Sequence, residues 1–285
     1  MPSLLDIRRR IRSVKNTQQL TKAMKTVSAA KLRRAQERVV SARPYADLLR
    51  QVLANLAAQV ENISHPLLEV RPEEKILILV VTADRGLCGA FNSNLIRSGQ
   101  GFLREHAGKD VRLYPVGRKG RDFFRRRGAA ITTDYINFFN KLDYGHAREI
   151  AQKVVELYAE SQVDAVYILY NEFKSAIQQR VSLEKLLPLG RSQLELASAT
   201  PREYIFEQPP QKEFDRLLPR YVEIQIYRAL LESAASEHGA RMAAMDTASR
   251  NAGDMIESLT LNMNRVRQAA ITREIIEVVS GAGAL

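Results

Sequence analysis

Residues 231–270 read LESAASEHGARMAAMDTASRNAGDMIESLTLNMNRVRQAA, and this stretch decides the fold. A heptad runs through it without adjustment, with ten of its twelve a and d positions apolar. These positions are Leu231, Ala235, His238, Met242, Met245, Ser249, Ala252, Ile256, Leu259, Met263, Val266 and Ala270. No proline follows Pro219, so the pattern predicts a helix of roughly 60 residues, about 90 Å long. Because a compact domain of this size is much narrower, we expect the helix to project.

The other end of the chain has a matching pattern. No proline stands between Pro2 and Pro44, and no glycine precedes Gly86, so nothing breaks a long helix that Ser3 could cap. Pro44 is expected only to kink this helix, since apolar spacing continues beyond it. The predicted buried stripe before Pro44 is Ile7, Ile11, Val14, Thr17, Leu20, Met24 and Val27.

Two such helices bury their stripes on each other only as an antiparallel coiled coil. The two ends of the chain are then expected to meet in a protruding rod. The seam is rich in alanine and methionine, which suits a slim and deformable pair. Gly239 and Gly253 lie inside the second helix, where they indicate close approach or bending.

The middle of the chain is predicted to be a small α/β domain. Apolar runs of strand length alternate with helical patterns, which favours a Rossmann-like, mostly parallel sheet. The expected strands are 76–82, 111–116, 131–135 and 163–170, with edge strands at 178–186 and 204–207. The fold class is therefore α/β plus a long antiparallel coiled coil. Its segments are an N-terminal helix with its continuation at 1–70, the α/β domain at 71–210 and the C-terminal helix at 211–285.

The positive charge is concentrated in one segment. The formal net charge is +11, and residues 1–43 carry 12 Lys and Arg against Asp6 and Glu37, which gives +10. Residues 220–285 carry 7 against 8, or −1. A basic helix of this kind requires an acidic partner, which could be nucleic acid, anionic lipid or an acidic protein surface.

Composition excludes several classes of protein. A single cysteine, Cys88, rules out an internal disulfide framework and fits a reducing compartment. No run of 18 apolar residues occurs, and the charged N-terminus has no apolar segment behind it, so we expect a chain that is neither secreted nor membrane-spanning.

A search for catalytic motifs finds none. The loop 84–92 follows a strand and precedes a helix, yet it has neither the GxxxxGK[ST] nor the GxGxxG pattern of phosphate-binding loops. No histidine stands near Cys88 in sequence to activate it, so we interpret it as a packed thiol. The four histidines, His65, His106, His146 and His238, are isolated. We therefore expect no catalytic residue, no metal site and no cofactor bound by this chain.

Specific residues resemble the γ subunit of F-type ATP synthases. Residues 7–31 are similar to that family's first helix, and the loop 84–92 to its central motif. The last 45 residues carry the most specific similarity, in 241–245, 251–254, 267–272 and 281–285. The resemblance covers essentially the whole chain and is of the bacterial type, because the cysteine-bearing chloroplast regulatory insert is missing. It implies a non-catalytic central-stalk rotor, which couples rotation of a membrane c ring to the nucleotide sites of three β subunits of a proton-translocating enzyme.

The resemblance also implies partners and contact residues. The partners are the α and β subunits, the ε subunit and the c ring, with no nucleic acid and no membrane insertion. The implied location is the cytoplasmic face of a bacterial inner membrane. Implied contacts are a β catch loop at Arg267, Gln268 and Thr272; acidic β lever loops at Arg8, Arg9, Arg12, Lys15, Lys22, Lys25, Lys31, Arg33 and Arg34; an apolar sleeve at Ala282, Ala284 and Leu285; and a foot near the c ring and ε at Tyr204, Phe206 and Glu207.

Two alternatives make different predictions. A nucleic-acid-binding coiled coil would use the basic segment and bind duplex DNA in a salt-sensitive way. An α/β enzyme with helical arms would show turnover by the isolated chain. The C-terminal helix is not basic and no recognition module or catalytic motif is present, so the sequence favours neither.

Overall fold

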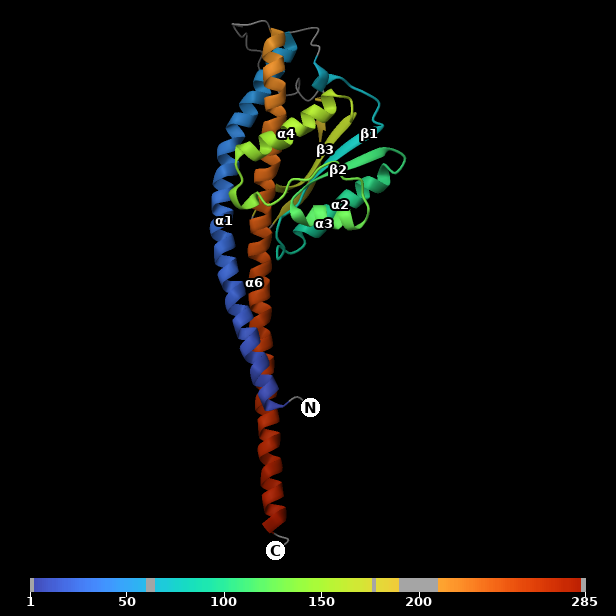
Figure 1. Ribbon diagram of the computed structural model, residues 1–285. Helices are drawn as coiled ribbons and strands as arrows, with labels where there is room; N and C mark the ends of the chain where they lie inside the picture. Colours follow the sequence, from blue (N-terminus) through green and yellow to red (C-terminus); the bar gives the residue numbers. More distant parts are fainter. Residues whose placement is uncertain (1–2, 60–64, 176–177, 190–209, 283–285) are drawn as a thin grey trace. The chain divides into compact units, whose positions relative to one another are not determined.

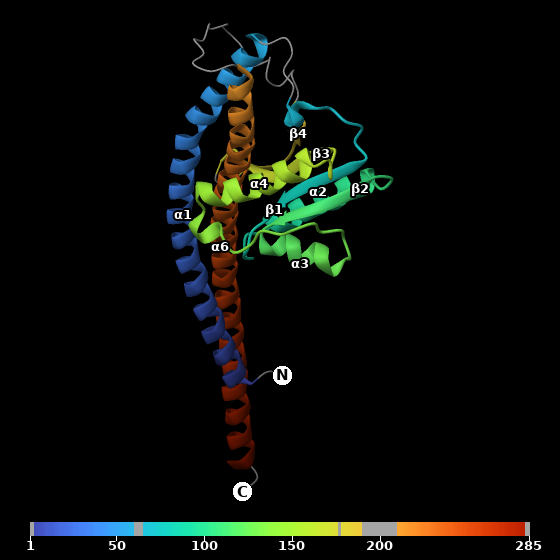
Figure 2. The same ribbon diagram turned by 45° about the horizontal axis from the view of Figure 1, so that its top comes forward.

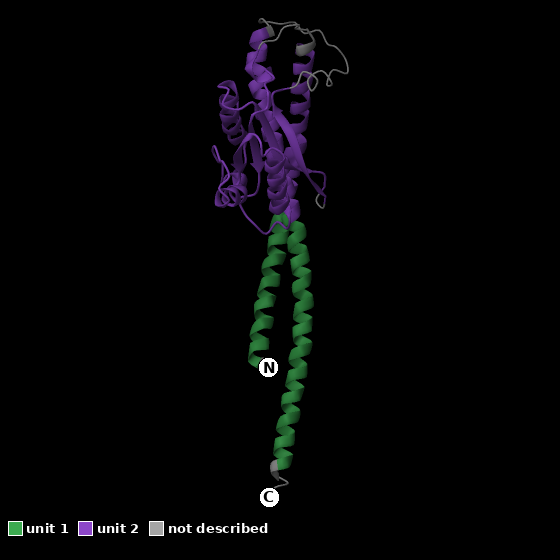
Figure 3. Cartoon of the chain, turned by 90° about the vertical axis from the view of Figure 1, so that its right-hand side faces the viewer, with its two compact units in different colours: residues 1–28, 241–285 green, residues 29–240 purple. Residues whose placement is uncertain are grey.

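The computed structural model describes residues 3–59, 65–175, 178–189 and 210–282 (Figure 1). It forms two compact units, residues 1–28 with 241–285, and residues 29–240 (Figure 3). Two long helices, α1 (Leu4–Gln59) and α6 (Pro210–Ala282), each contribute to both units. The three segments predicted from the sequence divide the chain differently, and they stay a prediction.

Both long helices extend as the sequence predicts. Ser3 caps the amino end of α1, because its Oγ accepts the backbone N–H of Asp6 while its own N–H donates to the Asp6 carboxylate. The helix continues through Pro44, and α6 likewise continues through Pro219. Neither proline ends its helix.

The first unit is an antiparallel pair of helices. Gln18 donates from Nε2 to the carbonyl oxygen of Ser249 at 3.3 Å, and Lys25 contacts Asp246 at 2.6 Å. As the numbers rise along α1 they fall along α6, so the two ends of the chain run in opposite directions. A Cβ on Gly253 would lie 3.2 Å from Nε2 of Gln18, so this glycine marks a close approach. The predicted pairing of the two ends is confirmed.

The seam on α6 is confirmed and the stripe on α1 is partly wrong. Every predicted a and d position from Leu231 to Ala270 is buried or half-buried. On α1, however, Thr17 is exposed, Leu20 is 66% exposed and Val27 is 56% exposed. A heptad accounts for most of the observed burial, although its member Lys25 is exposed and Met24, outside it, is half-buried. The buried or half-buried members are Ile7, Ile11, Val14, Gln18, Thr21, Ser28, Leu32, Ala35 and Val39. The seam therefore passes over polar residues in the middle of this stretch.

The second unit contains a four-stranded sheet. Its strands are β1 (Lys75–Val81), β2 (Asp110–Val116), β3 (Ala165–Phe173) and β4 (Gln179–Leu187), in the order β2-β1-β3-β4. β1 pairs in parallel with both β2 and β3, and β4 adds an antiparallel edge. The expected mostly parallel sheet is confirmed.

Helices cover the sheet and explain its apolar central strand. On one face, α2 (Phe91–Glu105) packs against β1 and β3, and α3 (Arg118–Arg126) packs against β2 (Figure 2). Ile76, Ile78 and Val80 join these helices in one core cluster, while Leu77 and Leu79 are also fully buried. Burial on both faces is why β1 is a continuous apolar run rather than an alternating one. The helix α4 (Tyr144–Ala159) also packs against β3.

Two of the predicted strands are not found as strands among the described residues. The strand expected at 131–135 is wrong, because only Ile131 and Tyr135 form single parallel bridges, to Leu113 and Val116. Between them Asp134 approaches Arg121 of α3 at 3.6 Å instead of continuing a ladder. The strand expected at 204–207 lies outside the described residues, as does the foot, Tyr204, Phe206 and Glu207.

Candidate functional surfaces

The basic face of α1 is open to solvent. All nine of the basic residues predicted to meet the lever loops are exposed. Lys25 and Arg33 form ion pairs with Asp246 and Glu37. The other seven have no ion pair within the described part of the chain, namely Arg8, Arg9, Arg12, Lys15, Lys22, Lys31 and Arg34. This face is available to an acidic surface, although its assignment to a partner stays a prediction.

An ion pair links the two helices of the first unit. The hydrogen bond from Lys25 lowers the pKa of Asp246 below its ordinary value, and Arg250 at 2.8 Å adds to the effect. Asp246 therefore stays ionised at neutral pH between two cations. One cation comes from each helix, so the carboxylate bridges α1 and α6.

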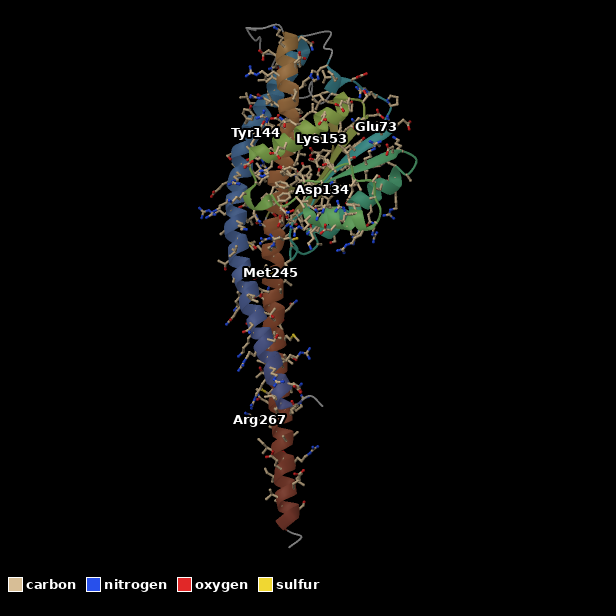
Figure 4. The ribbon with its side chains drawn as sticks, in the orientation of Figure 1. Glu73, Asp134, Tyr144, Lys153, Met245 and Arg267 are labelled. Carbon is tan, nitrogen blue, oxygen red and sulfur yellow. The ribbon has the colours of Figure 1, made fainter. Side chains whose placement is uncertain are left out.

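The predicted catch residues lie on the surface of α6. Arg267, Gln268 and Thr272 are all exposed (Figure 4 labels Arg267). The hydroxyl of Thr272 donates to the carbonyl oxygen of Gln268 at 2.9 Å, so it can only accept a hydrogen bond from a partner. Arg267 and Gln268 supply donors. The structure brings the three residues together within two turns, and their partner stays a prediction.

The last turns of α6 have no counterpart on α1. In the first unit α6 continues past the amino end of α1 (Figure 3), and residues 271–280 are all exposed. Ile275, Ile276, Val278 and Val279 are at least 57% exposed, which is unusual for aliphatic side chains so close together. Of the predicted sleeve residues, Ala282 is the last residue of α6, and Ala284 and Leu285 lie outside the described residues.

Deleting residues 276–285 is expected to leave the melting temperature of the chain unchanged to within about 1 °C, because surface changes cost little stability. The reason is that the side chains at 276–280 are all exposed. The truncated chain should also still assemble in part into the complex. A thermal unfolding scan of the truncated chain beside the full chain checks the first point. A fall of many degrees would mean that this end contributes to the folded core.

The loop after β1 joins three segments. One carboxylate oxygen of Asp84 accepts the backbone N–H of Arg118 and that of Asn137, both at 3.0 Å. Asn92 accepts the N–H of Ala83 at 2.9 Å and donates to Sγ of Cys88 at 3.2 Å. Cys88 is 1% exposed within the core cluster, so the packed thiol predicted from the sequence is confirmed. The side chains of Asp84 and Asn92 therefore hold together the turn, the start of α3 and the segment before η2 (Phe139–Lys141).

A buried carboxyl group lies in the second unit. Glu232 of α6 is 5% exposed, and its Oε2 has no hydrogen-bond partner. Burial raises its pKa above the ordinary value; Glu172 of β3 acts in the same direction, while Arg228 of α6, Arg43 of α1 and the backbone of Phe173 oppose the shift. Because the raised pKa belongs to the folded state, this carboxyl binds a proton more tightly when the chain is folded.

The stability that Glu232 contributes is present below its unfolded pKa, near 4.5, and is lost as the pH rises through the higher folded pKa. Glu232→Gln is expected to make the free energy of unfolding fall less between pH 4.5 and pH 8 than in the parent chain. Urea unfolding at the two pH values measures this difference. Glu257→Gln, exposed on the same helix, is the control and should behave as the parent does. A steeper fall in Glu232→Gln would contradict the assigned direction.

In the part of the chain that the structure describes, no cluster of three His, Cys, Asp or Glu side chains could hold a metal ion. No helix among those residues is both long enough and apolar enough to cross a bilayer.

Solved structures define the class. The central stalk and c ring of the Tetrahymena thermophila mitochondrial ATP synthase contains a chain that is 28% identical, with a TM-score of 0.64 over 81% of this chain and 99% of that chain. A chain in the Euglena gracilis mitochondrial enzyme has the same fold, with a TM-score of 0.72 at 20% identity over 99% of this chain and 94% of that one. The chain thus shares its fold with a chain from the central stalk and c ring of an ATP synthase.

Sequence comparison then gives the family. Residues 3–285 match the ATP synthase family (ATP-synt). The ATP synthase gamma chain of Solibacter usitatus is 56% identical over 100% of this chain and 99% of its own, and that of Pelotomaculum thermopropionicum is 52% identical over the full length of both. The chain belongs to the ATP synthase γ chain family. It is a structural rotor subunit of the central stalk in a membrane-associated complex, and not an enzyme in isolation.

Proposed function

We propose that this chain transmits rotation from a membrane c ring to the three catalytic β subunits of a bacterial, proton-translocating ATP synthase, on the cytoplasmic face of the inner membrane. The partners are the α and β subunits, the ε subunit and the c ring. The observation that carries the proposal is the antiparallel helix pair at the two chain ends, joined by Gln18–Ser249 and Lys25–Asp246. Two helices bonded to each other in this way can transmit torque as one body.

The basic face of α1 is assigned to acidic lever loops of β. Its cations are exposed and mostly without an acidic partner in the described chain. Exposed ion pairs contribute only about 0–1 kcal/mol each, so single contacts exchange easily while many together resist force. A shaft that must leave one β subunit for the next needs this combination of weak, numerous contacts.

The exposed end of α6 is assigned to two further contacts. Arg267, Gln268 and Thr272 meet a catch loop of β, and Ala282, Ala284 and Leu285 turn in an apolar sleeve. The aliphatic side chains at 275–279 support the sleeve, because they have no cover within the described chain. Tyr204, Phe206 and Glu207 contact the c ring and ε. Since one asymmetric shaft faces three identical β subunits, each angle favours a different conformation at each nucleotide site.

Single-molecule rotation tests the proposal. The complex is purified through a tag on this chain, subunit identities and ratios are measured, and a bead is attached at an introduced Lys109→Cys. Lys109 is exposed, and Cys88 is too buried to compete for the label. We expect the bead to turn in one direction with three pauses per turn when ATP is added. ATP hydrolysis by an intact complex with a stationary bead would contradict the proposal.

A further inference from the structure

A pocket of about 490 Å³ lies where α1, α4 and α6 meet within the second unit. One tyrosine from each helix lines it, Tyr45 of α1, Tyr144 of α4 and Tyr227 of α6 (Figure 4 labels Tyr144). The rings of Tyr144 and Tyr227 pack edge to face, with centroids 5.6 Å apart. Tyr45 is 53% exposed, so an aromatic wall is left open to solvent. Pockets of this volume hold small organic ligands.

The charge available in this pocket is positive. Arg148 of α4 and Arg220 of α6 line it, and neither forms an ion pair with another described residue. Glu223 also lines the pocket and accepts the hydroxyl of Tyr144, and its single negative charge is outnumbered by the two arginines. Arg228 is already engaged, since it contacts Glu184 of β4 at 2.6 Å. Two exposed guanidinium groups therefore remain for a ligand.

We propose that this pocket binds a planar aromatic anion of about nucleotide size. The aromatic ring packs among the three tyrosines, whose faces and edges favour stacked and edge-to-face contacts. The anionic group meets Arg148 and Arg220, because guanidinium groups bind phosphate, sulfonate and carboxylate oxygens in a bidentate way. None of the contact residues assigned above lines this pocket, so the site is distinct from those contacts.

Such a ligand would contact three helices at once. It binds only when α1, α4 and α6 are folded together, so it stabilises that arrangement by mass action. A raised melting temperature is the expected thermodynamic sign. The same chemistry is present in free nucleotides and in other aromatic anions, and the experiment must separate these sources.

The test uses the full-length chain alone, since the complete complex binds nucleotides elsewhere. Isothermal titration calorimetry and thermal unfolding are measured with ADP, with 8-anilinonaphthalene-1-sulfonate and with inorganic pyrophosphate. Binding of ADP supports a nucleotide ligand, and binding of the sulfonate alone supports another aromatic anion. Pyrophosphate should bind at least tenfold more weakly than the aromatic probe, because stacking contributes about that factor. Equal binding of pyrophosphate, or no binding of either aromatic probe, would overturn the proposal.

Matched variants locate the site. We expect the affinity for the aromatic probe to fall about tenfold in the double variant Arg148→Ala/Arg220→Ala and in the single variant Tyr45→Ala. Tyr45→Phe keeps the ring and should retain binding. All three positions are exposed, so folding is preserved. The control is Arg97→Ala/Arg126→Ala, exposed on α2 and α3 beside a second basic groove. If the control variant lost binding while the Arg148/Arg220 variant kept it, the anion would lie in that groove and the assignment would be refuted.

Discussion

Gly117→Ala is expected to lower the free energy of unfolding by about 3 kcal/mol or more, the range for a clash combined with backbone strain. Gly117 has φ of +108°, which side chains rarely adopt, and an added Cβ would lie 2.0 Å from the carbonyl oxygen of Thr82. The backbone there is held on both sides, by Thr82 N–H to Val116 O at 2.7 Å and by Gly117 N–H to Tyr135 O at 2.8 Å. Neither strand end can move away without breaking these bonds. Urea unfolding of the full chain measures the loss.

Two other glycines separate the causes. A Cβ at Gly128 would have no atom within 4 Å, but φ there is +67°. Gly128→Ala should therefore lower the free energy of unfolding by about 1 kcal/mol, from backbone strain alone. Gly101 lies inside α2 with open space around it, so Gly101→Ala should be neutral or stabilising by up to about 1 kcal/mol. If Gly117→Ala were no worse than Gly128→Ala, the close approach to Thr82 would not matter to stability.

Arg267→Ala/Gln268→Ala is expected to lower ATP turnover by the assembled complex about tenfold. A tenfold fall corresponds to the loss of one charge-assisted hydrogen bond at the rate-limiting step, because each rise of about 1.4 kcal/mol in the activation free energy slows the step tenfold. Both side chains are exposed, so the melting temperature of the chain should not change. The measurement is steady-state ATP hydrolysis by complexes of verified subunit ratio.

The matched control removes the same two chemical groups nearby. Asn262 and Arg265 are exposed on the same helix, one amide and one guanidinium, and Asn262→Ala/Arg265→Ala should keep most of the turnover. Unchanged turnover in the Arg267/Gln268 variant would remove the catch assignment. An equal fall in the control would mean that general surface charge, and not a specific loop contact, is responsible.

Regular periodicity explains which elements were predicted from the sequence. The α6 seam follows a heptad for twelve positions, and β1 is a single apolar run, so both signals repeat many times and point to one structure. The pairing of the chain ends followed because each long stripe needs a partner. The basic face of α1 was likewise visible in the charge count, since exposed cations follow directly from residue type.

The stripe on α1 shows where this reasoning failed. Between Val14 and Leu32, apolar residues at Leu20 and Val27 suggested one face. The helix instead buries Thr21 and Ser28 and half-buries Gln18. The seam continues the heptad already set by Ile7, Ile11 and Val14, because two helices that wind around each other keep the same heptad positions in contact, whereas straight helices would drift off them. Gln18 and Lys25 also bond across to α6, which favours this register.

By itself, then, the sequence determined two long helices that pair in opposite directions, a mostly parallel sheet between them and a basic face without an active-site motif. These properties depend on residue type and local periodicity. Only the tertiary structure decided which polar residues enter the α1 seam, where Asp84 and Asn92 hold the loop after β1, and that Tyr45, Tyr144 and Tyr227 share one pocket. Those positions are far apart along the chain, and no local pattern records a contact that exists only after the helices have packed.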